Sequence, residues 1–290
     1  MRVAVVGHVE WVEFAMVERV PRPGEIVHAS RTWEEPAGGG AVAAVQLAKL
    51  AGAATLFTAR GDDDRGRRAT DRLQALGVRV EATLRPEPQR RAFTFVDALG
   101  ERTITVIGER LGPDIDDPLP WDELATADAV YFTAGDRGTL LAARGARVLV
   151  ATSRVLEQLN HEGVPLDALV GSARDRDETF DPGALDPAPG LAVLTGGGGG
   201  GTYRQADGRR GAYPAASLPG PLADAYGAGD SFVAGLTFGL GAGMGADEAL
   251  SLAARCGAAC LTGHGPYDGQ LTLATGGRTP GAGGRPIDAR

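Results

Sequence analysis

The chain has 290 residues, 43% of them hydrophobic and 23% charged, which is enough apolar sequence for one large core. Its formal net charge of −8 argues against general nucleic-acid binding, and no apolar run is long enough to span a membrane. Cys256 and Cys260 lie one helical turn apart without further metal ligands nearby, so we expect core residues in a reduced, cytoplasmic protein.

Short apolar runs alternate with segments of helical length along the chain. The pattern predicts strands at residues 3–6, 54–58, 78–83, 92–97, 102–107, 129–132, 147–151, 168–170 and 191–195. It predicts helices at residues 41–51, 67–76, 231–240 and 246–261. Strands that alternate with helices favour an α/β fold with a mainly parallel sheet.

Two segments break this alternation, residues 9–35 and residues 88–109, and both are richer in strand signals. We expect them to form a small antiparallel sheet that stands off the main domain as a lid over a cleft. Two surface loops are the alternative. Residues 1–275 would then form one domain, and residues 276–290, rich in Gly, Pro and Arg, a disordered tail.

The stretch from residue 224 to residue 230 carries the clearest chemical signal. Gly227, Ala228 and Gly229 lead into Asp230, where a predicted helix begins. Small residues let the backbone approach a ligand, and free N–H groups at a helix start favour an anion such as phosphate. An acid beside that anion can take a proton from an attacking hydroxyl. The alternative for Asp230 is a plain N-cap.

A nucleotide site of the P-loop type is excluded. That motif needs a lysine directly after a glycine-rich loop. Lys49, the only lysine, lies within a predicted helix with no such loop before it. The six glycines at residues 196–201 match almost any glycine template and predict only a floppy loop.

Five motifs, in order along the chain, resemble the ribokinase-like (PfkB) carbohydrate kinases. Asp-Ala-Tyr-Gly-Ala-Gly-Asp at 224–230 is similar to the C-terminal signature, and the glycines at 38–40 before an alanine-rich helix are similar to the N-terminal one. The turn at 61–66, the hairpin tip at 100–103 and Thr195 with its following glycines match the remaining elements. The resemblance covers residues 1–275 and implies a three-layer αβα ribokinase-like fold with a mainly parallel central sheet.

The resemblance implies an ATP-dependent phosphotransferase that moves the γ-phosphate to a hydroxyl of a sugar. Asp230 would be the general base, and the backbone N–H groups of Gly227, Ala228 and Gly229 would form the anion hole. Mg²⁺ would bridge the nucleotide phosphates, a monovalent cation requirement stays open, and the lid would offer a homodimer interface. A nucleoside kinase is one alternative, and a catalytically degenerate fold that only binds or regulates is another.

The resemblance also distributes the site residues. It places the acceptor near Gly38, Gly39, Gly40 and Val42, and the nucleotide near Ser172, Asp175, Thr195, Gly197 and His264, with Asp175 serving the metal as well. Several positions depart from the family pattern. Val42 replaces an asparagine, and Ser172 and Asp175 stand for Asn and Glu.

The acid that usually grips the acceptor is replaced by Val12. Glu10 or Glu13 would substitute for it, depending on which face of the strand each side chain takes. Trp11 would either stack on a ring of the acceptor or pack inside the lid. A pocket with Val12 and Val42 is less polar than a usual sugar site, which favours a less hydroxylated or aromatic-bearing acceptor.

Overall fold

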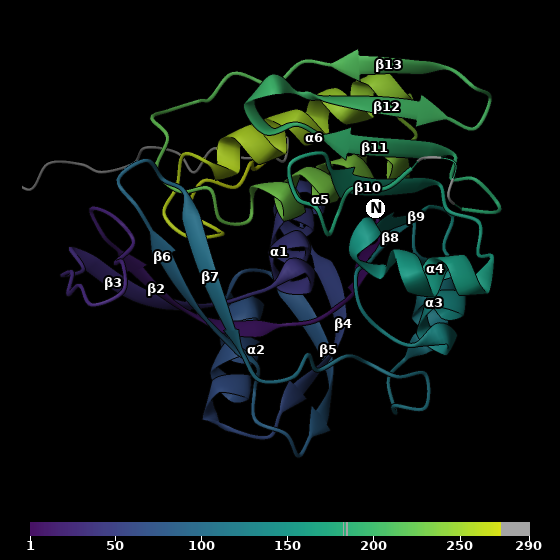
Figure 1. Cartoon of the computed structure of the whole chain (residues 1–290). Helices are drawn as coiled ribbons and strands as arrows, with labels where there is room; N and C mark the ends of the chain where they lie inside the picture. The colour runs from purple at the N-terminus through teal and green to yellow at the C-terminus, as the bar shows by residue number, and fades with distance from the viewer. Residues whose placement is uncertain (182, 184, 274–290) are drawn as a thin grey trace, which may run out of the picture.

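The computed structural model describes residues 1–181, 183 and 185–273, so the predicted tail lies outside the described residues. A nine-stranded sheet forms the middle of three layers, in the order β13-β12-β11-β10-β9-β8-β1-β4-β5 (Figure 1). Its strands are β1 (Val3–Val6), β4 (Ala54–Gly61), β5 (Val78–Arg85), β8 (Ala129–Phe132), β9 (Leu149–Thr152), β10 (Ala168–Ser172), β11 (Leu191–Thr195), β12 (Gly201–Gln205) and β13 (Arg210–Tyr213).

The sheet is parallel from β5 through to β11, and only β12 and β13 pair antiparallel. Every strand of the parallel part was predicted. Most are short apolar runs buried on both faces, whereas β5, at the edge of the sheet, is largely half-buried. The β12–β13 hairpin was not predicted. Its strands are largely half-buried or exposed and contain few large apolar side chains. A Cβ at Gly200 or Gly201 would collide with Tyr213, so only glycine fits at these two positions.

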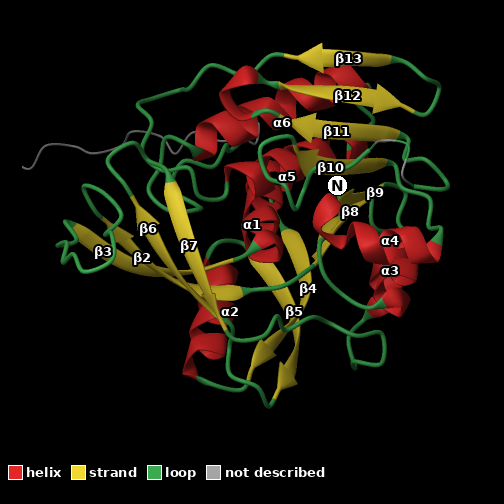
Figure 2. Ribbon diagram, viewed as in Figure 1, coloured by secondary structure: helices red, strands yellow, loops and turns green. Residues whose placement is uncertain are grey.

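Helices cover both faces of the sheet (Figure 2). One core cluster joins the sheet to α1 (Gly39–Ala51), α2 (Asp64–Ala75), α5 (Ala228–Gly241) and α6 (Ala246–Cys260). The other joins it to the 3₁₀ turn η1 (Trp121–Thr126), to α3 (Arg137–Arg144) and to α4 (Leu156–Glu162). The αβα layering is therefore as predicted, both cysteines are buried in α6, and no described helix is long and apolar enough to cross a membrane.

A second sheet stands beside the main one and consists of β2 (Glu10–Met16), β3 (Arg31–Ala37), β6 (Arg91–Val96) and β7 (Arg102–Ile107). These strands lie within the two segments expected to form a lid (Figure 1). The β3–β2 and β6–β7 pairs are antiparallel, whereas β2 and β6 run parallel. The direction follows from the main sheet, because β2 continues from β1 and β6 continues from β5, and these two strands share one direction.

Candidate active site

The candidate site lies where the parallel strands end and α1 and α5 begin. Open α/β sheets bind ligands at the carboxyl ends of their strands. Gly7 follows β1, Thr133 follows β8, Ser172 ends β10 and Thr195 ends β11, so the fold collects residues from four strands at one edge. This edge of the main sheet faces the lid (Figure 1).

The loop before α5 has a defined shape set by Asp224. Its side chain is fully buried and accepts hydrogen bonds from the backbone N–H of Tyr226 and of Gly265, both at 2.8 Å. Gly227 then adopts a φ of +79°, and α5 begins at Ala228. The first N–H groups of a helix have no partner within the helix, so they point into the site. A Cβ at Gly229 would meet nothing within 4 Å, which shows that the space above this helix start is open.

Asp230 lies in the first turn of α5 and faces the start of α1. A Cβ on Gly39 would come within 3.2 Å of Oδ1 of Asp230 and 3.1 Å of Oγ1 of Thr133. Burial, and next the negative charge of Glu178, raise the pKa of Asp230 to about 6. The positive charges of Arg102 and Arg154 oppose this rise. The result is a carboxylate whose pKa suits proton uptake near neutral pH.

The three glycines of the N-terminal motif have separate roles. Gly40 packs against the backbone of His8, where a Cβ would clash at 2.7 Å. Gly38 has a φ of +87° and leaves room for His8 and Glu10, each about 3 Å from where its Cβ would lie. Gly39 separates these residues from Asp230. The motif therefore places His8 and Glu10 beside Gly38, and the carboxylate of Asp230 beside the neighbouring Gly39.

The register of β2 separates the two glutamates that were candidates for the acceptor. Glu10 is 7% exposed and lies 3.6 Å from His8 and 3.2 Å from Arg90, beside Gly38. Glu13 lies on the opposite face of the strand, because the two positions differ by an odd number. There Glu13 pairs with Arg91. The structure therefore brings Glu10 into the site and leaves Glu13 outside it.

Two other positions flagged in the sequence also lie away from open space. Trp11 shares the outer face with Glu13, where the guanidinium of Arg68 covers its ring at 4.4 Å, so it packs between the lid and α2. Val42 is fully buried in α1, and its Cγ1 would lie 3.0 Å from a Cβ on Gly227. Val42 therefore supports the loop before α5 instead of presenting a polar group to a ligand.

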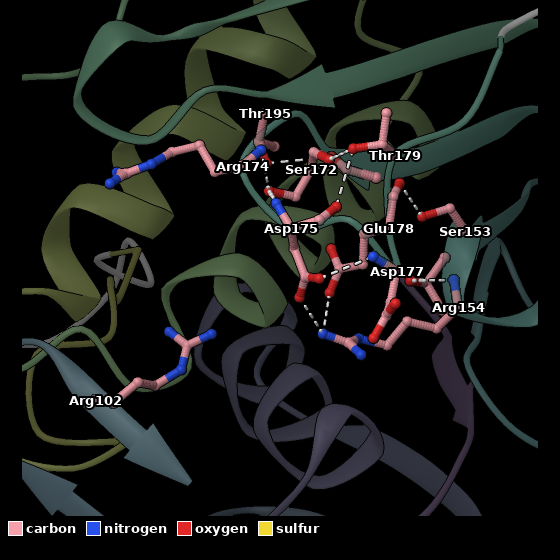
Figure 3. A network of polar contacts seen from close by, with 12 residues as sticks. Arg102, Ser153, Arg154, Ser172, Arg174, Asp175, Asp177, Glu178, Thr179 and Thr195 are labelled. Atoms are coloured by element: carbon pink, nitrogen blue, oxygen red, sulfur yellow. Dashed lines mark hydrogen bonds and ion pairs between the residues drawn. The ribbon is translucent and has the colours of Figure 1, made fainter.

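The nucleotide side contains a charge network that Figure 3 shows from close by. Oγ of Ser172 accepts hydrogen bonds from the backbone N–H groups of Arg174 and Asp175. Arg154, just after β9, forms ion pairs with Asp175 at 2.9 Å and with Glu178. One guanidinium thus holds two carboxylates together at the carboxyl edge of the sheet.

Glu178 and Arg154 were missed by sequence reasoning. The family motif ends at Asp175, although a second acid, Glu178, follows three residues later. Arg154 lies two residues after the end of β9, and strand ends are positions where ligand-binding groups gather. Thr133 was missed for the same reason. The strand ends themselves are the signal that points to these residues.

The remaining nucleotide candidates are split between two places. Oγ1 of Thr195 donates to the carbonyl of Gly171, and Gly197 adopts a φ of +63° against the guanidinium of Arg174. The glycine-rich loop is not an open floppy segment in the structure, because it closes into a 3₁₀ turn by hydrogen bonds such as Gly196 N–H to the carbonyl of Gly200. His264 lies instead beside Trp33 of the lid, at 6.4 Å between ring centroids.

The residues present suit a magnesium ion in donor type. Mg²⁺ favours one or two carboxylates together with phosphate oxygens and water, and Asp175 and Glu178 supply carboxylates on the nucleotide side. Within the described residues, no group of three or more His, Cys, Asp or Glu side chains forms a protein-only metal cage. An ion here would depend on nucleotide phosphates for its other ligands.

The family model of the pfkB carbohydrate kinases matches residues 1–179 and 184–273. The chain belongs to this family. No curated protein sequence matches the chain. Among solved structures, it is similar to ribokinase from Thermotoga maritima, with 19% identity, a TM-score of 0.76 and coverage of 94% of this chain and 96% of that one.

Two further structures have the same fold. Arabidopsis thaliana ribokinase, solved with ribose and ATP, shares 18% identity with a TM-score of 0.72, covering 93% of this chain and 96% of that one. A nucleoside kinase from Methanocaldococcus jannaschii shares 16% identity with a TM-score of 0.66, covering 93% and 95%. The neighbours therefore include kinases of both acceptor classes on one fold.

Proposed function

We propose that the protein transfers the γ-phosphate of ATP to a hydroxyl of a sugar, with Asp230 as the general base. The observation that carries this proposal is the position of Asp230. Its carboxylate, with a pKa raised to about 6, lies in the first turn of α5, next to N–H groups that lack helical partners and under open space at Gly229.

The proposed reaction uses these groups in a defined order. Asp230 takes the proton of the acceptor hydroxyl as its oxygen attacks the γ-phosphorus, and ADP leaves with the electrons of the broken P–O bond. The N–H groups of Gly227, Ala228 and Gly229 stabilise the charge that develops on the transferred group. Arg154 holds Asp175 and Glu178 in place on the nucleotide side. Mg²⁺, when bound, would neutralise phosphate charge.

The test is Asp230→Asn, assayed by ADP release with Mg²⁺-ATP against pentoses, hexoses, sugar phosphates and nucleosides. We expect wild-type turnover with at least one acceptor and a loss of about 10²-fold or more in kcat for the variant, the scale of a lost general base. Asp177→Asn, an exposed acid close in sequence to the nucleotide side, serves as the matched control. A wild-type rate in the Asp230 variant would remove Asp230 as the base.

The same experiment separates catalysis from simple ligand binding. If neither variant nor wild type turned over any acceptor, and ATP did not raise the melting temperature either, the kinase site would be degenerate and the chain would act as a binding protein on a kinase fold. If nucleosides were the only substrates, the sugar assignment would be wrong while the roles of Asp230 and the helix start would remain.

A further inference from the structure

The tip of the lid hairpin between β6 and β7 is a closely hydrogen-bonded turn. The side chain of Asp97 accepts hydrogen bonds from the backbone N–H of Leu99 at 2.9 Å and of Glu101 at 3.0 Å. The backbone of Asp97 also bonds to Gly100 and Glu101 across the turn. Aspartate side chains that bond to the backbone in this way stabilise a turn. The carbonyl of Gly100 and the start of β7 at Arg102 are therefore held in a fixed relation to each other.

This tip binds both polar backbone groups of one residue in the loop before α5. The N–H of Ala225 donates to the carbonyl of Gly100 at 2.9 Å. The carbonyl of Ala225 accepts a hydrogen bond from Nη1 of Arg102 at 2.8 Å. Arg102 extends from its lid strand toward the main domain, apart from the network of Arg154 (Figure 3). The lid thus holds Ala225 at its N–H and at its carbonyl.

The contact between the tip and the loop leaves no room for a side chain at position 100. Gly100 has a φ of +75°, and a Cβ there would lie 3.3 Å from the carbonyl oxygen of Ala223. Residues other than glycine rarely adopt this conformation, and the added atom would press against backbone and not against a movable side chain. Gly100 therefore lets the lid backbone lie directly against the loop.

The residues just before Ala225 are held by the main domain instead. The N–H groups of Ala223 and Asp224 both donate to the carbonyl of Leu261, the residue that follows α6. Ala225 lies between this attachment and Gly227, the first of the three residues proposed for the anion hole. The orientation of the Ala225 backbone therefore affects the direction of the N–H groups that follow it.

We propose that Arg102 is a positioning residue that acts through the carbonyl of Ala225 and holds the start of α5 in the orientation needed to bind the transferred phosphate. The inference rests on the proposed function and deepens it, because the lid then supports the anion hole. A guanidinium suits this task, since its rigid fork loses little freedom per hydrogen bond and its charge strengthens the bond. A displacement of about 1 Å in such a site can cost about 10²-fold in rate.

The test is Arg102→Gln, because glutamine is too short to reach the carbonyl of Ala225. Arg102 also lowers the pKa of Asp230, so kcat is measured at pH 8.5, well above that pKa of about 6, where the charge effect no longer limits the rate. We expect kcat to fall about 10- to 100-fold while KM for ATP changes less than about threefold. Arg102→Lys keeps a positive donor of similar reach and should restore kcat to within about threefold of wild type.

Gly100→Ala displaces the tip from the loop without removing a charge. We expect a loss of kcat similar to that of Arg102→Gln. Because both changes act through Ala225, their effects should not add, and the double variant should stay within about threefold of the slower single variant. Fully additive losses would overturn the inference, since Arg102 would then act on a substrate independently of the loop.

Two matched controls make the same changes elsewhere. Arg91→Gln removes a lid arginine that pairs with Glu13 at 2.6 Å. Gly208→Ala adds a methyl at a glycine with a φ of +88° in the β12–β13 turn, where its Cβ would meet nothing within 4 Å. Both controls should keep the wild-type kcat. If each control lost as much as its counterpart, charge removal or turn strain alone would explain the effect and the inference would be overturned.

The outcomes separate this inference from the proposed function. A wild-type kcat at pH 8.5 in Arg102→Gln would overturn the inference and leave the kinase. If no acceptor were turned over, the proposed function would fail, and amide hydrogen exchange of residues 225–230 would decide on the positioning role. Faster exchange in Arg102→Gln and Gly100→Ala, but not in the controls, would support that role. Exchange at the wild-type rate in both variants would overturn it.

Discussion

At the scale of single residues, the pKa of Asp230 is set by neighbouring charges of both signs. Burial and Glu178 raise its pKa, whereas Arg102 from the lid and Arg154 from the main sheet lower it. Each of these side chains comes from a different part of the chain, so the pKa of Asp230 depends on how the lid and the loop after β10 are placed. Charge changes at these positions should therefore appear in the pH profile of turnover.

Wild-type kcat should fall as the pH drops below about 6, because Asp230 must be ionised to accept a proton. Glu178→Gln removes a negative neighbour, so the pKa of Asp230 should fall and the acid limb should move to lower pH. Arg102→Gln removes a positive neighbour, so the limb should move to higher pH. Rate profiles between pH 4.5 and 8 check both, and shifts in the same direction would contradict this electrostatic account.

The raised pKa of Asp230 also affects stability. In the unfolded chain this carboxyl ionises near its ordinary pKa, so rising pH favours unfolding between about pH 4 and 6, and the full penalty remains above pH 6. Asp230→Asn should therefore raise the free energy of unfolding at pH 7.5 by about 1–2 kcal/mol and leave it nearly unchanged at pH 4. Urea unfolding at the two pH values measures this, and an equal effect at both would exclude ionisation as the cause.

At the scale of elements, the starts of α1 and α5 lie at the base of the site, and the lid contacts the loop that precedes α5. The carbonyl of Gly100, at the β6–β7 turn, accepts from the N–H of Ala225, and Arg102 donates to the carbonyl of Ala225 at 2.8 Å. The hairpin tip is thus bound directly to the loop that leads into α5. A change in lid position would move the helix start that carries Asp230.

Gly229→Ala tests the helix start of α5 without removing a charge. The added methyl meets no atom of the protein within 4 Å, and alanine is preferred to glycine in a helix, so stability should rise by about 0.5–1 kcal/mol. The methyl would occupy the space proposed for the transferred phosphate, so kcat should fall at least about tenfold. Thermal unfolding and ADP release measure the two effects.

Gly245→Ala provides the matched control for that change. Gly245 precedes α6, its Cβ position is equally open, and it lies outside the site. Its kcat should stay at the wild-type value. Equal losses of kcat in the two variants would show that the space above Gly229 has no special role.

At the scale of the whole molecule, the inner face of the lid and its β7 edge differ in burial. The inner face continues the main core, where Phe14 stacks on Trp33 at 4.8 Å and meets the edge of Tyr226 at 5.0 Å. Its edge strand β7 is exposed along its whole length, and Ile104, Val106 and Ile107 are each at least 40% exposed. An apolar, unpaired edge strand is unusual in a monomer because it can pair with another chain.

We therefore expect the protein to form a homodimer through the β7 edge of the lid. Ile107→Glu should shift the molar mass from dimer to monomer, because a buried carboxylate without a partner is costly at an interface. Light scattering across a concentration series measures this. Leu141→Glu, an exposed apolar position in α3 on the side away from the lid, is the control (Figure 1). A wild-type chain that is monomeric at every concentration would contradict the expectation.

The family, the layered αβα fold, the lid segments and the glycine-containing loop before Asp230 could all be predicted from the amino-acid sequence. These features depend on local patterns, such as buried apolar runs and glycines at helix starts, which neighbouring residues in the chain reveal.

Which charged side chains pair with one another became clear from the three-dimensional fold alone. The ion pairs of Arg154, the choice of Glu10 over Glu13 and the ion pair of Arg90 with Glu10 depend on strand register and on which strand ends share an edge. Register is set by pairing between segments far apart in the chain, and shifting it by one residue reverses every side chain. For that reason Asp230 was found from its motif, whereas the charges that surround it emerged from the fold.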